Sequence, residues 1–363
     1  MIKKLIFSAL LVILWVLFVT SFYKTVVTML LFAVWYDEIK QNLPQSIRQY
    51  AIKGTWLGLV ICLWLAMPRY RINSSDRVRL LYLDNKGKPK HPPLGQYVLS
   101  ALLPEEEIVN FAIKNVNLFC PLMRRMGVGH SLIRQVQSDC SEERIDNFVK
   151  PYDMFGFDNP ISGVYPQVFN EAFAGHNRSV YITFPKHYDS KKEYPLVVFC
   201  HGYLGNWKLY QGVWLSLDNC MVLSVGTRGL NGIFSKSDIN DIFTYYLPSL
   251  ETMGYCIDRR QIHLIGLSNG GSAIIATMHS THVKDFKSIT TVSCNLEGLC
   301  KVPCQVNFIG GGKDLSASRM PEQHKRLRRM GVKSEIYFEE AEDHFILVNK
   351  RENIIDFLKT KVL

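Results

Sequence analysis

The sequence lacks the features of a nucleic-acid-binding protein and of a small disulfide-rich secreted protein. No helix-turn-helix, zinc-finger or base-stacking motif accompanies the formal net charge of +10, so the excess of positive charge does not by itself indicate a nucleic-acid partner. The nine cysteines form neither a disulfide framework nor a zinc-site spacing. Internal repeats and low-complexity segments are also lacking, and the 47% of hydrophobic residues is ordinary for a globular chain.

Three cysteines lie near one another in "CNLEGLCKVPC": Cys294, Cys300 and Cys304. A metal site or a disulfide is one interpretation. Reduced, mostly buried thiols are the other, and the one we expect, because free cysteine behaves as a small apolar residue. The sequence therefore predicts no metal and no cofactor.

Charge is nearly absent from residues 5–36, where Lys24 is the only charged side chain. As one helix this stretch would be roughly 48 Å long, more than a bilayer core of about 30 Å requires. A second apolar segment ends at Pro68, although its uncharged part, residues 54–67, is short for a span. An interfacial or buried helix is the alternative there. We predict a membrane anchor over residues 1–68 with two transmembrane helices.

The side of the membrane follows from basic residues near the span ends. Lys3 and Lys4 precede the first span, and a basic juxtamembrane stretch follows the second from Arg69 to Lys90. Fewer basic residues lie between, so both termini and the main domain are predicted to be cytoplasmic. A single span would place the domain outside. A cleaved signal peptide is less favoured, because "VTSFYK" offers no small-x-small cleavage site.

For residues 69–159 we predict a basic juxtamembrane linker and a small helical accessory segment. The stretch 86–95 is rich in Pro, Gly and Lys, and 104–127 reads as a helix with acidic residues first and arginines last. A further helix is expected near Ser141. No motif in this segment indicates a chemistry.

Residues 160–363 predict an α/β domain. After a hairpin turning near 175–177, apolar strands alternate with helices, which favours a mostly parallel sheet covered on both faces. The strands are expected at "YPLVVFC", "CMVLSVG", "QIHLIG", "SITTVSC", "QVNFIG" and "SEIYFEE".

The stretch Gly266-Leu267-Ser268-Asn269-Gly270 fits the pattern G-x-S-x-G. A serine on a sharp strand-to-helix turn adopts strained backbone angles and exposes its hydroxyl, which requires neighbours without a Cβ. Gly271 additionally lets the helix approach the sheet. Ser268 is therefore the candidate nucleophile.

Two loops are expected to complete the site. In "VVFCHGYLGN" the backbone N–H of Tyr203, together with that of Asn269, is the candidate oxyanion hole. "NFIGGGKD" supplies Asp314 and "FEEAEDHF" supplies His344, in the chain order expected for an acid and a base on loops after successive later strands. His201 is expected to be structural. The rival residues are His324 as base and, as acid, Glu339, Glu340, Glu342 and Asp343.

Over residues 165–363 the chain resembles the α/β-hydrolase superfamily, and within it dienelactone-hydrolase-like esterases and the catalytic domains of prolyl-oligopeptidase-like enzymes. The stretches that carry the resemblance are "YPLVVFCHGYLGN", "TRGLNG", "IDRRQIHLIGLSNGG", "GGGKD" and "EDHF". The resemblance implies a serine nucleophile and the triad Ser268, Asp314 and His344, but no substrate. The chain lacks the propeller of the oligopeptidases and a long lid insertion, and the role of Arg228 stays open.

The resulting hypothesis is a membrane-anchored serine hydrolase that cleaves small-molecule or lipid esters or thioesters through an acyl-serine intermediate. A serine peptidase with the same triad is one alternative. A catalytically silent, membrane-tethered binding module is the other, because fold alone does not fix function.

Overall fold

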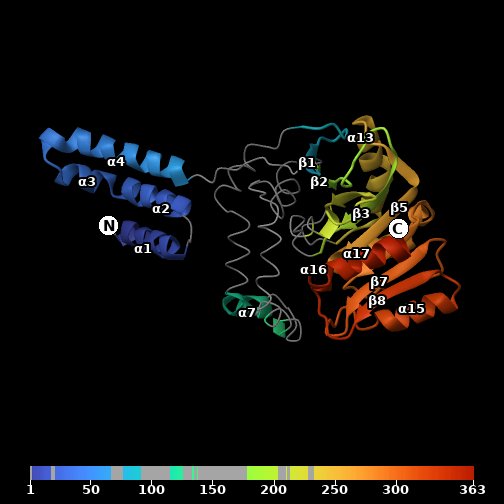
Figure 1. Cartoon of the computed structure of the whole chain (residues 1–363). Coiled ribbons are helices and arrows are strands. Elements are labelled where there is room, and N and C mark those ends of the chain that lie inside the picture. The colour runs from blue at the N-terminus through green and yellow to red at the C-terminus, as the bar shows by residue number, and fades with distance from the viewer. Residues whose placement is uncertain are drawn as a thin grey trace.

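The computed structural model describes residues 2–17, 21–66, 77–90, 115–125, 133–134, 137, 178–202, 210, 213–227 and 233–363. A single mixed sheet forms the centre of the main domain (Figure 1). Its order is β1-β2-β4-β3-β5-β6-β7-β8. The strands are β1 (Val78–Leu83), β2 (Arg178–Thr183), β3 (Tyr194–Cys200), β4 (Met221–Val225), β5 (Ile257–Leu267), β6 (Ser288–Val292), β7 (Gln305–Gly311) and β8 (Ser334–Glu339).

The strands from β4 to β8 in the sheet order are all parallel, whereas β2 runs antiparallel to both β1 and β4. Every residue of β4, β6 and β7 is buried, because parallel strands are covered on both faces. The mostly parallel sheet predicted from the continuous apolar runs is confirmed.

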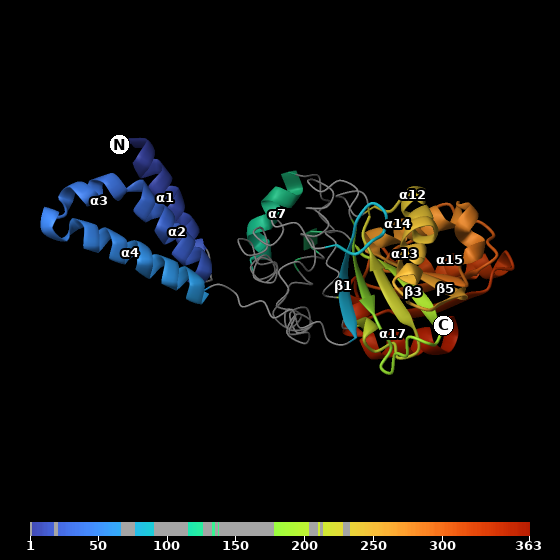
Figure 2. The same ribbon diagram turned by 90° about the horizontal axis from the view of Figure 1, so that it is seen from above.

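Helices cover both faces of the sheet (Figure 2). One face packs against α12 (Lys236–Asp241), α13 (Leu247–Thr252), α14 (Gly271–Met278) and α15 (Met320–Arg329). The other packs against α16 (Ile346–Asn349) and α17 (Arg351–Phe357). Two apolar cores therefore hold the sheet in place, and the loops after the strands are free to carry functional groups.

Strand β1 corrects the predicted domain boundary at residue 160. It lies within the segment expected to be linker and helix, yet it forms an edge of the sheet, with Leu81 opposite Val180. Val78 and Leu83 at its ends are fully buried. The strand is short, and its first apolar residue, Val78, lies between Arg77 and Arg79. Its hydropathy pattern therefore does not differ visibly from that of the basic stretch around it. The sheet domain thus includes residues far before 160.

The N-terminal region contains α1 (Ile2–Leu17), α2 (Ser21–Val34), α3 (Tyr36–Asn42) and α4 (Gln45–Ala66). The predicted first span is thus described as two shorter helices, α1 and α2. Trp35, directly after α2, donates a hydrogen bond from Nε1 to Ser8 Oγ of α1 at 2.8 Å. Of the helices that the structure describes, none combines the length and apolarity needed to cross a bilayer. The two-helix anchor stays a prediction.

The accessory segment contains α7 (Val116–Arg125), which is the described part of the helix predicted over 104–127. The predicted hairpin turn at 175–177 and the helix near Ser141 lie outside the described residues.

Candidate active site

Ser268 stands at the corner between β5 and α14. Its φ of 52° lies in the left-handed region, which is uncommon for a residue with a side chain and costs about 1–3 kcal/mol. The strand and the helix hold the residue there from both sides, and its side chain is half-buried. The turn therefore presents the serine hydroxyl at the end of β5.

Close approaches explain the three glycines around Ser268, to backbone at Gly266 and Gly270 and to a side chain at Gly271. A Cβ on Gly266 would lie 2.2 Å from the carbonyl oxygen of Gly270, and one on Gly270 would lie 2.1 Å from that of Cys200. A Cβ on Gly271 would lie 2.4 Å from Cys294 Sγ. A Cβ at any of these three positions would collide with the neighbouring atom. The turn therefore requires glycine at all three.

The structure brings Ser268, His344 and Asp314 into one hydrogen-bonded row. His344 Nε2 lies 3.0 Å from Ser268 Oγ, and His344 Nδ1 lies 2.9 Å from Asp314 Oδ2. Asp314 follows β7 and His344 follows β8. Because β5, β7 and β8 are parallel, their carboxyl ends meet at the same edge of the sheet.

Asp314 is only 1% exposed. Burial would raise its pKa, but hydrogen bonds from His344 and Ser316 outweigh burial, and its pKa lies below the usual value. Ser316 donates to Asp314 Oδ1 through its hydroxyl at 2.6 Å and through its backbone N–H at 2.9 Å. The carboxylate is thus ionised and accepts the Nδ1–H of His344, which leaves Nε2 facing Ser268 as an acceptor.

Two serines near the row were missed by the sequence analysis. Ser316 Oγ lies 3.2 Å from His344 Nδ1 and 2.9 Å from the carbonyl oxygen of Ser293. Ser293 Oγ in turn donates to the carbonyl oxygen of His344 at 2.9 Å. Ser316 follows an aspartate by two residues, a spacing typical of side-chain-to-backbone turns, whereas Ser293 has no such sequence pattern. Together they fix the acid and the base.

The rival acids and the rival base are engaged elsewhere. Asp343 Oδ1 accepts the backbone N–H of Phe345 at 2.8 Å. Glu339 and Glu342 form ion pairs with Lys350, and Glu340 lies beside Gly312. His324 Nδ1 is hydrogen-bonded to Ser334 Oγ at 2.9 Å. Asp314 and His344 therefore remain the candidate acid and base, since His344 contacts Ser268 and Asp314 contacts His344.

The loop after β3 also approaches Ser268. A Cβ on Gly202 would lie 3.2 Å from Ser268 Cβ. His201 is fully buried, its Nδ1–H donates to the Gly202 carbonyl at 2.7 Å, and burial lowers its pKa to about 4. It is thus a neutral structural residue. Asn269 directly follows Ser268, whereas the other candidate oxyanion donor, Tyr203, lies outside the described residues, as does Arg228.

The clustered cysteines have separate environments. Cys294 lies beside Gly271, Cys300 Sγ is 3.8 Å from the Met278 carbonyl oxygen, and Cys304 is buried. All three are free thiols. Within the described ranges no group of His, Cys, Asp and Glu is arranged to hold a metal ion.

Together these features define an α/β-hydrolase-like fold, in which Ser268, Asp314 and His344 follow β5, β7 and β8. No protein-family model matches the sequence, and neither does any curated protein. Among solved structures, the fold is similar to acylaminoacyl peptidase from Pyrococcus horikoshii, with a TM-score of 0.40 and 15% identity over 51% of this chain and 40% of that one.

Two esterases are similar to the same extent. A thermostable esterase has a TM-score of 0.40 and 19% identity over 50% of this chain and 59% of that one. The carboxylesterase from Bacillus cereus has a TM-score of 0.41 and 16% identity over 54% of this chain and 99% of that one. The aligned region thus spans less than two thirds of the peptidase and of the thermostable esterase.

Replacing Ser316 with alanine tests its role in holding Asp314. The variant loses a hydrogen bond to a charged group, worth about 1.5–3 kcal/mol, so we expect the rate of Ser268 modification by a fluorophosphonate to fall roughly tenfold or more. Ser318→Ala is the matched control, since among the described residues Ser318 Oγ donates only to the nearby Leu315 carbonyl, at 2.9 Å. Equal rates in wild type and Ser316→Ala would show that Ser316 does not position the acid.

Replacing Asp314 with asparagine tests the ionised state of the buried carboxylate. A carboxylate with a lowered pKa stabilises the fold above its unfolded pKa of about 4 and loses that stabilisation as pH falls through its folded pKa. We therefore expect Asp314→Asn to unfold more easily by about 1–3 kcal/mol at pH 7, with a gap that narrows in acid. Urea unfolding between neutral and acidic pH measures the gap, with exposed Asp356→Asn as control. A gap independent of pH would contradict an ionised Asp314.

Proposed function

We propose that the chain is a serine hydrolase that cleaves carboxylic esters or thioesters through an acyl-serine intermediate. The observation that carries this proposal is the continuous row from Ser268 Oγ through the His344 ring to Asp314. A serine hydroxyl is a weak nucleophile at neutral pH and needs an adjacent base that a third group orients. Ser268 and Asp314 each lie within hydrogen-bonding distance of the His344 ring.

The reaction follows from this geometry. Ser268 Oγ attacks the carbonyl carbon while its proton passes to His344 Nε2, and Asp314 stabilises the imidazolium. The backbone N–H groups of Asn269 and Tyr203 are proposed to hold the oxyanion. Collapse of the tetrahedral adduct breaks the bond to the leaving group, which takes the proton from His344. Water then attacks the acyl-serine while His344 accepts its proton. Collapse of this second adduct breaks the bond to Ser268 Oγ, which takes the proton back from His344, and the carboxylic acid is released.

Membrane attachment through the N-terminal helices belongs to the same proposal. Among the described residues, α1 and α4 expose large apolar side chains, including Leu5, Ile6, Ile13, Leu57 and Ile61, and such surfaces favour a bilayer over water. The distribution of basic residues favours the cytoplasmic side.

An apolar acyl group is the proposed substrate portion. Leu315, the neighbour of Asp314 in the chain, is 60% exposed, and a large apolar side chain beside the acid offers a contact for hydrocarbon. Lipid esters and soluble acyl esters or thioesters both meet this description.

Hydrolysis of p-nitrophenyl esters of increasing chain length tests the proposal in the full-length protein in detergent. Ser268→Ala and His344→Ala are each expected to lower kcat at least about a thousandfold, because the groups of a triad act as a unit. His324→Ala is the matched control and should keep wild-type activity, since His324 faces Ser334.

Three results would contradict parts of the proposal. Hydrolysis of an aminoacyl amide with little activity on the matching ester would favour a peptidase. No turnover and no fluorophosphonate labelling of folded wild type would favour the silent binding module. Rapid cleavage of short esters with none of long ones would rule out a lipid substrate.

A further inference from the structure

Exposed positive charge lines the edge of the sheet at which the parallel strands begin. This edge lies opposite the one that carries Ser268, because Ser268 follows the end of β5. The start of nearly every parallel strand brings an exposed cation to it. We define the basic edge by six such residues: Lys191, Arg259, Arg260, Lys287, Lys301 and Lys333.

Much of this charge is not neutralised. Arg259 pairs with Glu251 at 2.7 Å, and Arg260 pairs with Asp258 at 3.0 Å. Within the part of the chain that the structure describes, the four lysines of the basic edge form no ion pair. Exposed Glu193 also lies at this edge, directly before β3, but the four lysines still leave an excess of positive charge available to an external partner.

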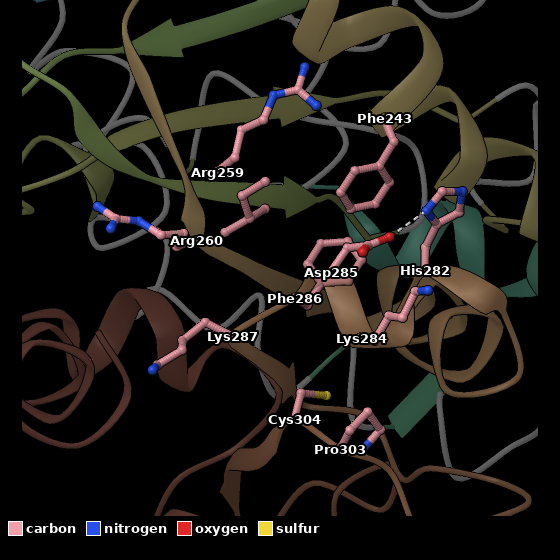
Figure 3. Close-up of a pocket in the computed structure, with 11 residues that line it drawn as sticks. Phe243, Arg259, Arg260, His282, Lys284, Asp285, Phe286, Lys287, Pro303 and Cys304 are labelled. Carbon is pink, nitrogen blue, oxygen red and sulfur yellow. Dashed lines mark hydrogen bonds and ion pairs between the residues drawn. The ribbon is translucent and has the colours of Figure 1, made fainter.

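The arrangement of the cations suits a broad partner rather than a small one. A cavity of about 590 Å³ opens at this edge, between Phe243 and Cys304. The charged ends of Arg259, Arg260 and Lys287 point in different directions around it (Figure 3). A small anion is bound by polar groups that converge on one point. Side chains that diverge fit an extended anionic surface instead.

The chain itself ties the basic edge to the apolar helices. Strand β1 is antiparallel to β2, which is antiparallel to β4, so β1 begins at the basic edge. Arg77, just before β1, pairs there with Asp218 at 3.3 Å. Helix α4 ends at Ala66. The chain from there to Arg77 can span at most about 40 Å when fully extended. Helices held in a bilayer would thus leave the basic edge within reach of the bilayer surface.

We propose that the basic edge docks on the anionic phospholipid surface to which the N-terminal helices attach the chain. The edge of the sheet that carries Ser268 then faces the aqueous phase. This inference rests on the membrane attachment in the proposed function and is independent of the reaction. It favours substrates that reach the site from water, such as soluble acyl esters or thioesters, over lipids that stay within the bilayer.

Lysine footprinting of the full-length wild-type protein tests the proposal. The protein is bound to vesicles of phosphatidylcholine alone or mixed with phosphatidylserine, acetylated with an amine-reactive ester and mapped by mass spectrometry. In the mixed vesicles the lysines of the basic edge should react at least about threefold more slowly, and high salt should abolish this protection. Lys236 and Lys313 are exposed at the Ser268 edge and serve as matched controls; their rates should not change.

Different results would overturn the proposed orientation, the membrane attachment or the reaction. Equal lysine rates in both kinds of vesicle, or protection of Lys236 and Lys313 instead, would overturn the proposed orientation. Failure to float with either vesicle would overturn the membrane attachment itself. Stronger protection of the same lysines by duplex DNA than by phosphatidylserine would assign the edge to nucleic acid. Absence of ester hydrolysis in the same samples before acetylation, with the lysine protection intact, would contradict only the proposed reaction.

Discussion

The close contact between the turn at Ser268 and the end of β3 is the constraint on which the candidate site depends. Gly270 approaches the Cys200 carbonyl so closely that no Cβ fits between them. This contact sets the sharp angle between β5 and α14 and holds Ser268 at a φ of 52°. Strain of this kind persists only where the surrounding packing determines it. Two apolar cores, one on each face of the sheet, supply that packing.

Burial of a charged acid is the second cost that the structure must offset. Asp314 is removed from water, and the transfer of an isolated carboxylate into a protein interior is strongly unfavourable. Donors from Ser316 and His344 compensate, and they also set the direction of the imidazole ring. The same hydrogen bonds thus stabilise the fold and orient the base toward the nucleophile. Stability and reactivity share one set of contacts at this edge of the sheet.

Much of the site was predictable because its determinants are local in sequence. The glycines around Ser268 and the apolar strands before Asp314 and His344 each leave a short pattern, and parallel pairing then brings the three residues together. Ser293 could not be found in this way, because its contact with the His344 carbonyl joins residues that are 51 positions apart. The sequence also left the rival acids open, since only packing decides where Asp343 and Glu342 point.

The prediction of the fold was weakest before residue 160. Strand β1 is short and lies at the sheet edge, and its pairing with β2 spans a long stretch of chain, which no local pattern can indicate. The apolar stretch at residues 5–36 predicted the total length of the apolar segment but not its division into α1 and α2, because hydropathy does not determine where a helix ends. The pairing of β1 with β2 is a long-range contact, whereas the chemistry-bearing residues follow from local patterns.

Trapping of an acyl-enzyme tests whether Ser268 is the nucleophile. The protein is mixed with p-nitrophenyl acetate, quenched in acid before the acyl group is released, digested and mapped by mass spectrometry. We expect one acetyl group on the peptide that contains Ser268, no such adduct in His344→Ala, and none on the buried cysteines. An acetyl group on a different residue, or turnover of the ester with Ser268 unmodified at every quench time, would contradict a nucleophilic Ser268.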